Sequence, residues 1–226
     1  MKYKIVLIGS TGGGVLSKIG RHSFVKDTVY EVVSDRDCGF LNVAKSFSIP
    51  AAKLAADDGL RFSDLLYERY SLLHNFIFLS FYTKLLGGEF LRHSKGFLFN
   101  CHPSLLPSFK GMHGFEDTIK SSCLFMGCSL HQIDEGVDTG ECVIQAAIPL
   151  NRRIPFVENR HKVFLMQYYS TLQFIKWVYE DRLLLKHNNS PVVVDPCFEP
   201  SSFSPNLDAN FFDFIGEENQ LVFSCK

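Results

Sequence analysis

Short apolar runs alternate with helix-like stretches along the N-terminal half of the chain. Runs rich in β-branched and aromatic residues have the length of buried strands at residues 4–8, 29–34, 76–81 and 97–100. Stretches with helical spacing of apolar residues fall at 15–24, 40–47, 62–73 and 84–93. This alternation is typical of βαβ units, in which helices cover both faces of the sheet. It predicts an α/β fold with an open, doubly wound, mostly parallel, Rossmann-like sheet.

The pattern changes after Cys123. Two strand-like runs, 124–133 and 142–150, flank an Asp/Gly-rich segment, and a long helix is predicted over 157–179. The apolar stripe of that helix predicts core packing. Four prolines beyond residue 188 predict an irregular surface tail. We therefore expect a C-terminal strand pair and long helix inside one domain, residues 1–187. The tail, 188–226, would pack on that domain or extend from it.

The composition indicates which kinds of partner the protein is expected to bind. The chain has 23 Lys and Arg against 24 Asp and Glu, so it lacks the basic surface of proteins that bind nucleic acids or acidic membranes. No apolar run approaches the ~20 residues of a membrane span or the core of an export signal. The seven cysteines are scattered, which predicts reduced thiols and a cytoplasmic protein. The eight histidines have no metal-ligand spacing, so no metal is predicted. A small-molecule partner is favoured.

A glycine-rich loop at residues 9–14 follows the first strand and opens the first helix. Backbone N–H groups in such a loop can hold a phosphate, and the same glycines also permit a tight turn. Together with Asp35 after the second strand, the loop also fits an NAD(P)-dependent reductase, in which the acid binds ribose hydroxyls. None of the eight tyrosines is followed four residues later by lysine, so the proton donor of short-chain reductases is missing.

An amide, an imidazole and a carboxylate follow strand-like runs. Asn100 and His102 lie at the end of the run at 97–100, and Asp138 lies in the Asp/Gly-rich segment. Ligands of open α/β sheets bind at the carboxyl ends of the strands, where these side chains are expected to meet. An amide and an imidazole can donate to an oxyanion, and a carboxylate can orient the imidazole and accept a proton.

The motifs that carry these residues resemble the folate-dependent formyltransferases, in particular the glycinamide ribonucleotide formyltransferase family. The resemblance rests on Asn-x-His-Pro-Ser-Leu-Leu-Pro at 100–107, Lys-Gly-Met-His at 110–113, and Asp-Glu-x-x-Asp-x-Gly at 134–140. Similarity also covers the strand and glycine loop at 4–14, the strand end at 33–35 and residues 177–183. It leaves the tail uncovered.

The resemblance implies transfer of a formyl group from 10-formyltetrahydrofolate to a primary amine whose molecule carries a phosphate. It implies catalysis by Asn100, His102 and Asp138. It also implies binding of the acceptor's phosphate by Gly12, Gly13, Gly14 and Val15 and of its ribose by Gln167. The folate-binding residues it implies are Arg61, Thr83, Lys84, Leu85, Leu86, Leu98, Asn100, Ile133, Asp134, Glu135 and Val137. Arg61 would serve the folate tail or the phosphate.

The chain departs from the family pattern at three places. The phosphate loop usually ends Gly-Ser-Asn but here reads Gly12-Gly13-Gly14, and Gln167 stands where a glutamate usually binds ribose hydroxyls. Thr83-Lys84 replaces the usual Met-Arg, and lysine lacks the planar fork of arginine. The resemblance makes glycinamide ribonucleotide the first expected acceptor, and an amino-sugar nucleotide is the nearest alternative. A binding paralogue without activity is a further alternative. The sequence predicts no oligomeric state.

Overall fold

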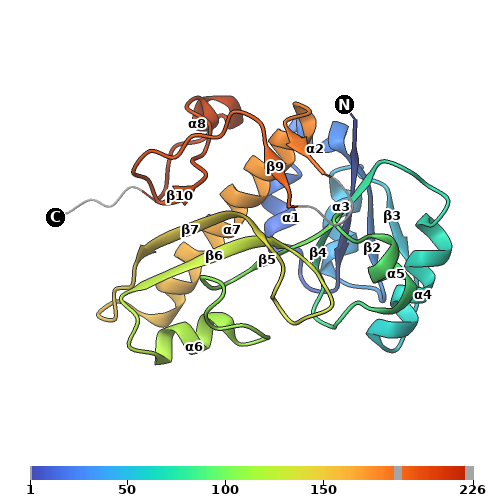
Figure 1. Ribbon diagram of the computed structural model, residues 1–226, viewed down its shortest axis with the longest axis horizontal. Coiled ribbons are helices and arrows are strands. Elements are labelled where there is room, and N and C mark those ends of the chain that lie inside the picture. The colour runs from blue at the N-terminus through green and yellow to red at the C-terminus, as the bar shows by residue number, and fades with distance from the viewer. Residues whose placement is uncertain (1, 186–189, 222–226) are drawn as a thin grey trace.

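A mixed eight-stranded sheet runs through the structure, a computed structural model that describes residues 2–185 and 190–221 (Figure 1). From one edge to the other the strands are β10 (Phe203–Ser204), β7 (Cys142–Pro149), β6 (Phe125–Gln132), β5 (Leu98–His102), β4 (Phe76–Phe81), β1 (Lys4–Gly9), β2 (Val29–Ser34) and β3 (Ala51–Lys53). Strands β3, β2, β1, β4 and β5 are parallel to one another. Strands β6, β7 and β10 continue the sheet in antiparallel fashion. This confirms the predicted fold class.

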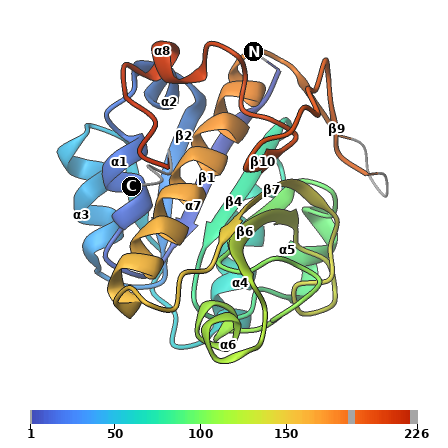
Figure 2. The same ribbon diagram turned by 90° about the vertical axis from the view of Figure 1, so that its left-hand side faces the viewer.

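Helices cover both faces of the sheet, as Figure 2 shows. One face carries α1 (Gly14–Ile19), α2 (Ser23–Thr28), α3 (Gly39–Ser46) and the long α7 (Phe156–Tyr179). The other face carries α4 (Gly59–Tyr70) and α5 (Gly88–His93). Because both faces are covered, β1 has five buried residues after Lys4, and β2 is buried except at Tyr30. The short α6 (Gly114–Lys120) follows β5.

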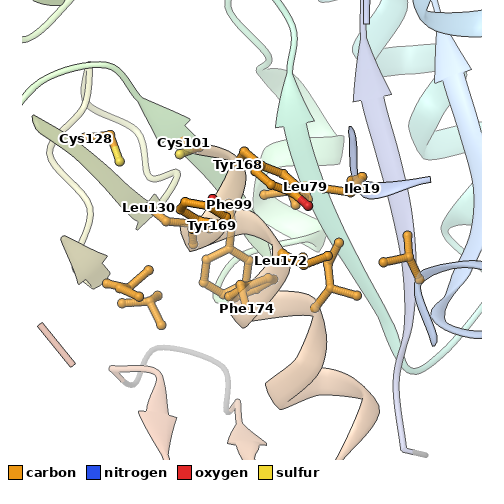
Figure 3. Close-up of a cluster of buried hydrophobic side chains, with 14 of the residues drawn as sticks. Ile19, Leu79, Phe99, Cys101, Cys128, Leu130, Tyr168, Tyr169, Leu172 and Phe174 are labelled. Atoms are coloured by element: carbon orange, nitrogen blue, oxygen red, sulfur yellow. The ribbon is translucent and has the colours of Figure 1, made fainter. Parts of the chain in front are cut away.

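The long helix α7 holds much of the core against β5 and β6 (Figure 3). Phe174 packs on Phe99 of β5 with ring centroids 4.9 Å apart. Leu172 is fully buried in the same cluster, and burial of a side chain of this size contributes about 1.5–3 kcal/mol. The predicted core stripe of the helix is thus confirmed there. Phe164 differs, since it is only half-buried and faces the cavity described below.

The order of the strands reverses between β1 and β4. From β1 the chain moves outward through β2 and β3, then returns to place β4 on the other side of β1. The loops that leave the carboxyl ends of β1 and β4 therefore diverge, and a crevice opens between them. This crevice is where the glycine loop and residues 82–86 come together.

Several predicted elements have different bounds in the structure. The helix expected over 15–24 is two helices, because the chain from Gly20 to His22 leaves the helical path and His22 is extended. The helix expected over 84–93 begins only at Gly88, whose φ of 62° and whose extended neighbour Gly87 prevent an earlier start. Strand β3 and helix α6 had no counterpart in the prediction. The strand has three residues, too few for a period-2 pattern.

Four short elements follow α7 in the described part of the chain. β8 (Leu183–Leu184) pairs with β9 (Val192–Val193), β10 adds to the edge of β7, and α8 (Phe211–Ile215) packs near α2 and α7. The domain boundary predicted at residue 187 lies outside the described residues, and the division into two parts stays a prediction. Cys225 and His187 also lie outside them.

None of the helices in the described part of the chain is both long enough and apolar enough to span a lipid bilayer. The six described cysteines are free thiols.

Candidate active site

A cavity of about 740 Å³ opens at the carboxyl ends of β1, β4 and β5. This volume lies within the range of small-molecule sites, roughly 300–1,000 Å³. Most of its lining comes from five segments: the glycine loop, residues 80–86 at the end of β4 and beyond, residues 100–103 of β5 and beyond, residues 131–138 at the end of β6 and beyond, and one face of α7. Segments far apart in the sequence thus converge where the sheet topology predicts a ligand site.

Most of the predicted site residues face this cavity. Those that line it are Gly13, Gly14, Val15, Thr83, Lys84, Leu85, Leu86, Asn100, His102, Ile133, Asp134, Glu135, Val137, Asp138 and Gln167. Three do not. Gly12 is exposed outside the lining, and Leu98 is fully buried in the core against α4 and α5. Arg61 is exposed on the first turn of α4, 3.8 Å from Glu68.

Strand geometry places Asn100 and His102 on the same side of β5. Residues two apart along a strand point the same way, so both side chains reach the cavity together. Asn100 is half-buried, and its carboxamide makes no side-chain hydrogen bond within the described part of the chain. Its donor group is therefore available to a bound molecule.

The ring of His102 is held between two oxygen acceptors. Its Nε2 lies 2.9 Å from the carbonyl oxygen of Phe109, and because a carbonyl can only accept, Nε2 carries a proton. Its Nδ1 lies 3.4 Å from Asp138 Oδ2. The side chain is buried, with 6% of its surface exposed. The carbonyl contact fixes the orientation of the ring and leaves Nδ1 as the nitrogen beside the carboxylate and the cavity.

Asp138 is placed by three neighbours. The backbone N–H of Gly111 donates to its Oδ2 at 2.7 Å, and His131 Nε2 lies 3.5 Å from its Oδ1. Interaction with His131, aided by Gly111 and His102, outweighs burial and lowers the pKa of Asp138 from 3.8 to about 2. The backbone of Asp138 has a φ of 50°, a conformation that Asp and Asn tolerate better than most residues. The carboxylate is thus ionised and firmly oriented at neutral pH.

The lowered pKa of Asp138 predicts a pH-dependent contribution to stability. A carboxyl whose pKa is lower in the folded state stabilises the fold above its unfolded pKa, and that stabilisation is lost as the pH falls through the folded value. The shift from 3.8 to about 2 corresponds to roughly 2 kcal/mol. We expect wild type to lose this amount relative to Asp138→Asn between about pH 6 and about pH 2. Urea unfolding of both proteins across this range measures it, and a constant difference would contradict the assignment.

Gln167 lies on α7 with its amide fully engaged. Its Nε2 donates to the carbonyl of Cys101 at 2.9 Å, and its Oε1 accepts from Arg160 at 3.3 Å. Gln167 therefore sits directly behind β5, bonded to the residue that lies between Asn100 and His102, and borders the same cavity.

Asp35 does not present a free carboxylate to a ribose. Its side chain has no exposed surface, and it accepts two hydrogen bonds from Arg36, both at 2.7 Å. Tyr82 donates to it at 2.8 Å and Lys84 at 3.1 Å. These contacts hold residues 82–84 at the cavity wall. They leave Asp35 unavailable for the role that a dinucleotide-dependent reductase requires.

Several lining residues were not assigned to the site from the sequence, notably Tyr82, His131, Arg160 and Phe164. His131 is buried and contacts Asp138. The antiparallel pairing of β5 with β6, which sets Asn100 opposite His131, brings it there. His113, from the motif at 110–113, does not line the cavity.

Within residues 2–185 and 190–221, no cluster of three or more His, Cys, Asp or Glu side chains could hold a metal ion. The expectation of a metal-free site stays a prediction.

Comparison with known proteins gives consistent matches. A family model described as formyl transferase matches residues 3–155. The chain is 27% identical over 203 residues to a chloroplastic phosphoribosylglycinamide formyltransferase of Vigna unguiculata, which covers 84% of this chain and 65% of that protein. It is 34% identical over 110 residues to the trifunctional purine biosynthetic protein adenosine-3 of Homo sapiens, covering 45% of this chain and 10% of that protein. The chain therefore spans only a small part of the trifunctional relatives.

The fold is also found among solved structures. A glycinamide ribonucleotide transformylase of Symbiobacterium toebii superposes with a TM-score of 0.75 at 24% identity, covering 85% of this chain and 94% of that one. At this identity the similarity establishes the fold.

Proposed function

The chain belongs to the formyl transferase family, and from this premise we propose that it transfers a formyl group from 10-formyltetrahydrofolate to the primary amine of glycinamide ribonucleotide. One observation carries the proposal. Asn100, His102 and Asp138, which come from two segments far apart in the sequence, face one cavity at the switch point of the sheet. The names of the relatives that match this chain support the choice of acceptor.

The proposed reaction exchanges one carbon–nitrogen bond for another. The acceptor amine attacks the formyl carbon, a bond from that carbon to the amine forms, and the bond to the folate nitrogen breaks. The attack places negative charge on the formyl oxygen, which the Asn100 amide and Nδ1–H of His102 stabilise. Preorganised donors of this kind are typically worth about 3–4 kcal/mol each. The proton that the amine releases passes to Asp138, directly or through water, and the folate nitrogen takes up a proton on leaving.

The structure adds one feature to this mechanism. Because the Phe109 carbonyl occupies Nε2 of His102, the donor to the formyl oxygen is Nδ1, which therefore needs its own proton. The carboxylate of Asp138 lies 3.4 Å from this nitrogen and so helps to orient the ring toward the formyl oxygen. Asp138 thus serves both the imidazole and the amine.

Folate would occupy the part of the cavity formed by residues 82–86 and 133–138. Flat heterocycles bind between apolar walls, and a few polar groups at the edge set their orientation. Leu85 and Val137 expose large apolar surfaces here, and Ile133 and Leu86 are half-buried. The residues present therefore fit the co-substrate, which supplies the formyl group. Arg61 and Leu98 are left out of the proposed site because they do not line the cavity.

The acceptor's phosphate would bind at the glycine loop. Gly13 adopts a φ of 77° at the start of α1, a conformation that glycine provides without strain. A side chain at Gly13 would also approach the backbone of Phe40, so the loop is shaped by glycine and not by side-chain donors. Gly13, Gly14 and Val15 remain the proposed contacts.

A cytoplasmic location stays a prediction from the scattered thiols.

One assay tests the proposed function. Purified protein is mixed with 10-formyltetrahydrofolate and offered either glycinamide ribonucleotide or a panel of amino-sugar nucleotides, and deformylated folate is followed. Consumption that depends on glycinamide ribonucleotide supports the proposal. Consumption only with an amino-sugar nucleotide would assign the alternative acceptor. Folate binding without turnover on any amine would indicate an inactive paralogue and contradict the proposal.

Substitution of Gly114 tests how the His102 ring is held in place. A Cβ at this position would lie 2.5 Å from His102 Nε2 and 2.7 Å from the Phe109 carbonyl oxygen. Gly114→Ala must therefore push the ring away from its acceptor. We expect kcat for formyl transfer to fall by about a hundredfold, because a misplacement of about 1 Å is enough for such a loss.

Asp117→Ala, an exposed position on α6, is the matched control and should keep wild-type kcat. The thermal midpoint of both variants separates a displaced ring from general unfolding. Wild-type kcat in folded Gly114→Ala would show that the Phe109 contact does not orient His102 for catalysis.

A further inference from the structure

The cavity carries an uncompensated positive charge on its α7 side. Its lining contains two permanently charged cations, Lys84 and Arg160. Lys84 is paired with the Asp35 carboxylate at 3.1 Å and donates to the Asp57 carbonyl at 2.8 Å. The contacts of Arg160 are with neutral groups: Gln167 Oε1 at 3.3 Å and the ring of Phe115 at 5.3 Å. Within the described part of the chain, no carboxylate forms an ion pair with Arg160.

The neutrality of Gln167 keeps that charge available. Arg160, Phe164 and Gln167 lie four and three residues apart, so they share one face of α7. The amide of Gln167 donates to the Cys101 carbonyl, which turns its oxygen toward Arg160. A glutamate at 167 would form an ion pair with Arg160 at this separation and would leave the Cys101 carbonyl without its donor. Glutamine satisfies the carbonyl and leaves the guanidinium charge unpaired.

The glycine loop lies against the same face of α7. A Cβ added at Gly14 would come within 3.3 Å of the Phe164 ring. The loop itself contributes no side-chain donor between Gly12 and Gly14. An anion held between the loop and α7 would therefore obtain its charge compensation from Arg160. The planar guanidinium can bind two phosphate oxygens at once, which an ammonium cannot match in geometry.

We infer that Arg160 binds the phosphate of the acceptor, and that Gln167 sustains this role by staying neutral. The inference rests on the proposed function, since it assumes an acceptor that carries a phosphate monoester. It identifies Arg160 as a specificity-determining residue that the motif at residues 9–14 does not contain. It also gives a physical reason for two departures from the family pattern, because residues 12–14 bring no side-chain donor and the neutral residue at 167 leaves the arginine unpaired.

Calorimetric titration with ribose 5-phosphate tests the inference without formyl donor. Wild type is compared with two variants, Arg160→Gln and Gln167→Glu. The second variant keeps the arginine but gives it a carboxylate as an ion-pair partner. Loss of a charge-assisted contact is expected to weaken ribose 5-phosphate binding about tenfold or more in Arg160→Gln. Gln167→Glu should weaken it in the same direction. Arg153→Gln, an exposed arginine outside the cavity lining, removes the same charge and should bind as wild type does.

Unchanged affinity in folded Arg160→Gln, or equal weakening in Arg153→Gln, would overturn the inference. So would the absence of ribose 5-phosphate binding to wild type, or binding no tighter than that of ribose. Titration reports the phosphate contact independently of turnover. If wild type binds ribose 5-phosphate through Arg160 but transfers no formyl group, the proposed function fails and the phosphate site stands.

Discussion

Asp138→Asn is expected to lower kcat for formyl transfer by about a hundredfold to ten-thousandfold, the range over which a positioned acid or base acts. Asparagine keeps the shape of the side chain and tolerates the φ of 50° at this position, so the loop should remain in place. It removes the negative charge that lies 3.4 Å from His102 Nδ1. The charged partner of His102 and the proton acceptor for the amine would be lost together.

Alanine at any of the three positions is expected to abolish turnover for a related reason. His102→Ala and Asn100→Ala each remove one donor to the formyl oxygen, a loss of about a hundredfold to a thousandfold in kcat. Because Asp138 acts partly through His102, the double variant Asp138→Asn/His102→Ala should lose much less than the product of the single losses.

Single-turnover and steady-state kinetics on these variants give the measurement, with folate affinity followed by fluorescence. Folate binding should survive, because the apolar contacts at Leu85, Leu86 and Val137 are untouched. Asp117→Asn, exposed on α6 away from the cavity, controls for the loss of one negative charge. Wild-type turnover by Asp138→Asn would remove Asp138 from the mechanism, and fully multiplicative losses in the double variant would separate it from His102.

The parallel half of the sheet could be predicted because its strands carry their own signal. β1, β2 and β4 are largely buried on both faces and so appear as mostly apolar runs, with bounds that match the structure closely. The start of α5 could not be placed in the same way. Residues 84–86 have helix-forming side chains, but Lys84 is held outside a helix by its contacts with Asp35 and the Asp57 carbonyl. A tertiary ion pair overrode local propensity there.

Some residues of the candidate site could also be predicted from the sequence, and others could not. Asn100, His102 and Asp138 stand out because short motifs carry them, and the topology of the sheet predicts where they meet. His131 and Arg160 carry no such motif. His131 reaches Asp138 only through the register of β5 and β6, and Arg160 reaches the cavity only because α7 crosses behind β5. Strand register and helix placement depend on residues far apart in the sequence. Local sequence patterns therefore do not predict that His131 and Arg160 belong to the site.

Lys176→Met is expected to lower the free energy of unfolding by about 3 kcal/mol. This is the lower end of the range for removing one partner of a buried ion pair. Lys176 has 4% of its side chain exposed and lies 2.6 Å from Asp208 and 2.7 Å from Glu180. Methionine retains the apolar stem but removes the charge, so Asp208 keeps only Arg182 and Gln173 as partners. Those remaining bonds place the expected loss below the upper limit. For a chain of this size, it corresponds to roughly 6–12 °C in the thermal midpoint.

The ion pair between Lys176 and Asp208 connects the C-terminal segment to the long helix α7. Asp208 precedes α8, whereas Lys176, Gln173 and Arg182 belong to α7 and the residues just after it. Burial raises the pKa of Asp208, but hydrogen bonds from Lys176, Gln173 and Arg182 outweigh it and lower the pKa overall. The contact therefore stabilises the fold above the unfolded pKa of an aspartate and weakens as the pH falls through the lowered value.

Urea unfolding of Lys176→Met, Asp208→Asn and the double variant, at neutral and at acidic pH, measures the coupling between the two residues. Contacting charged partners should show an interaction energy of about 0.5–3 kcal/mol at neutral pH. The interaction energy should shrink in acid, where Asp208 gains a proton. Lys120→Met, exposed on α6, removes a lysine from the surface and should change the free energy of unfolding by no more than about 0.5 kcal/mol. Additive losses at neutral pH would mean that Lys176 stabilises α7 through Glu180 alone, and that the C-terminal segment is held by its apolar contacts.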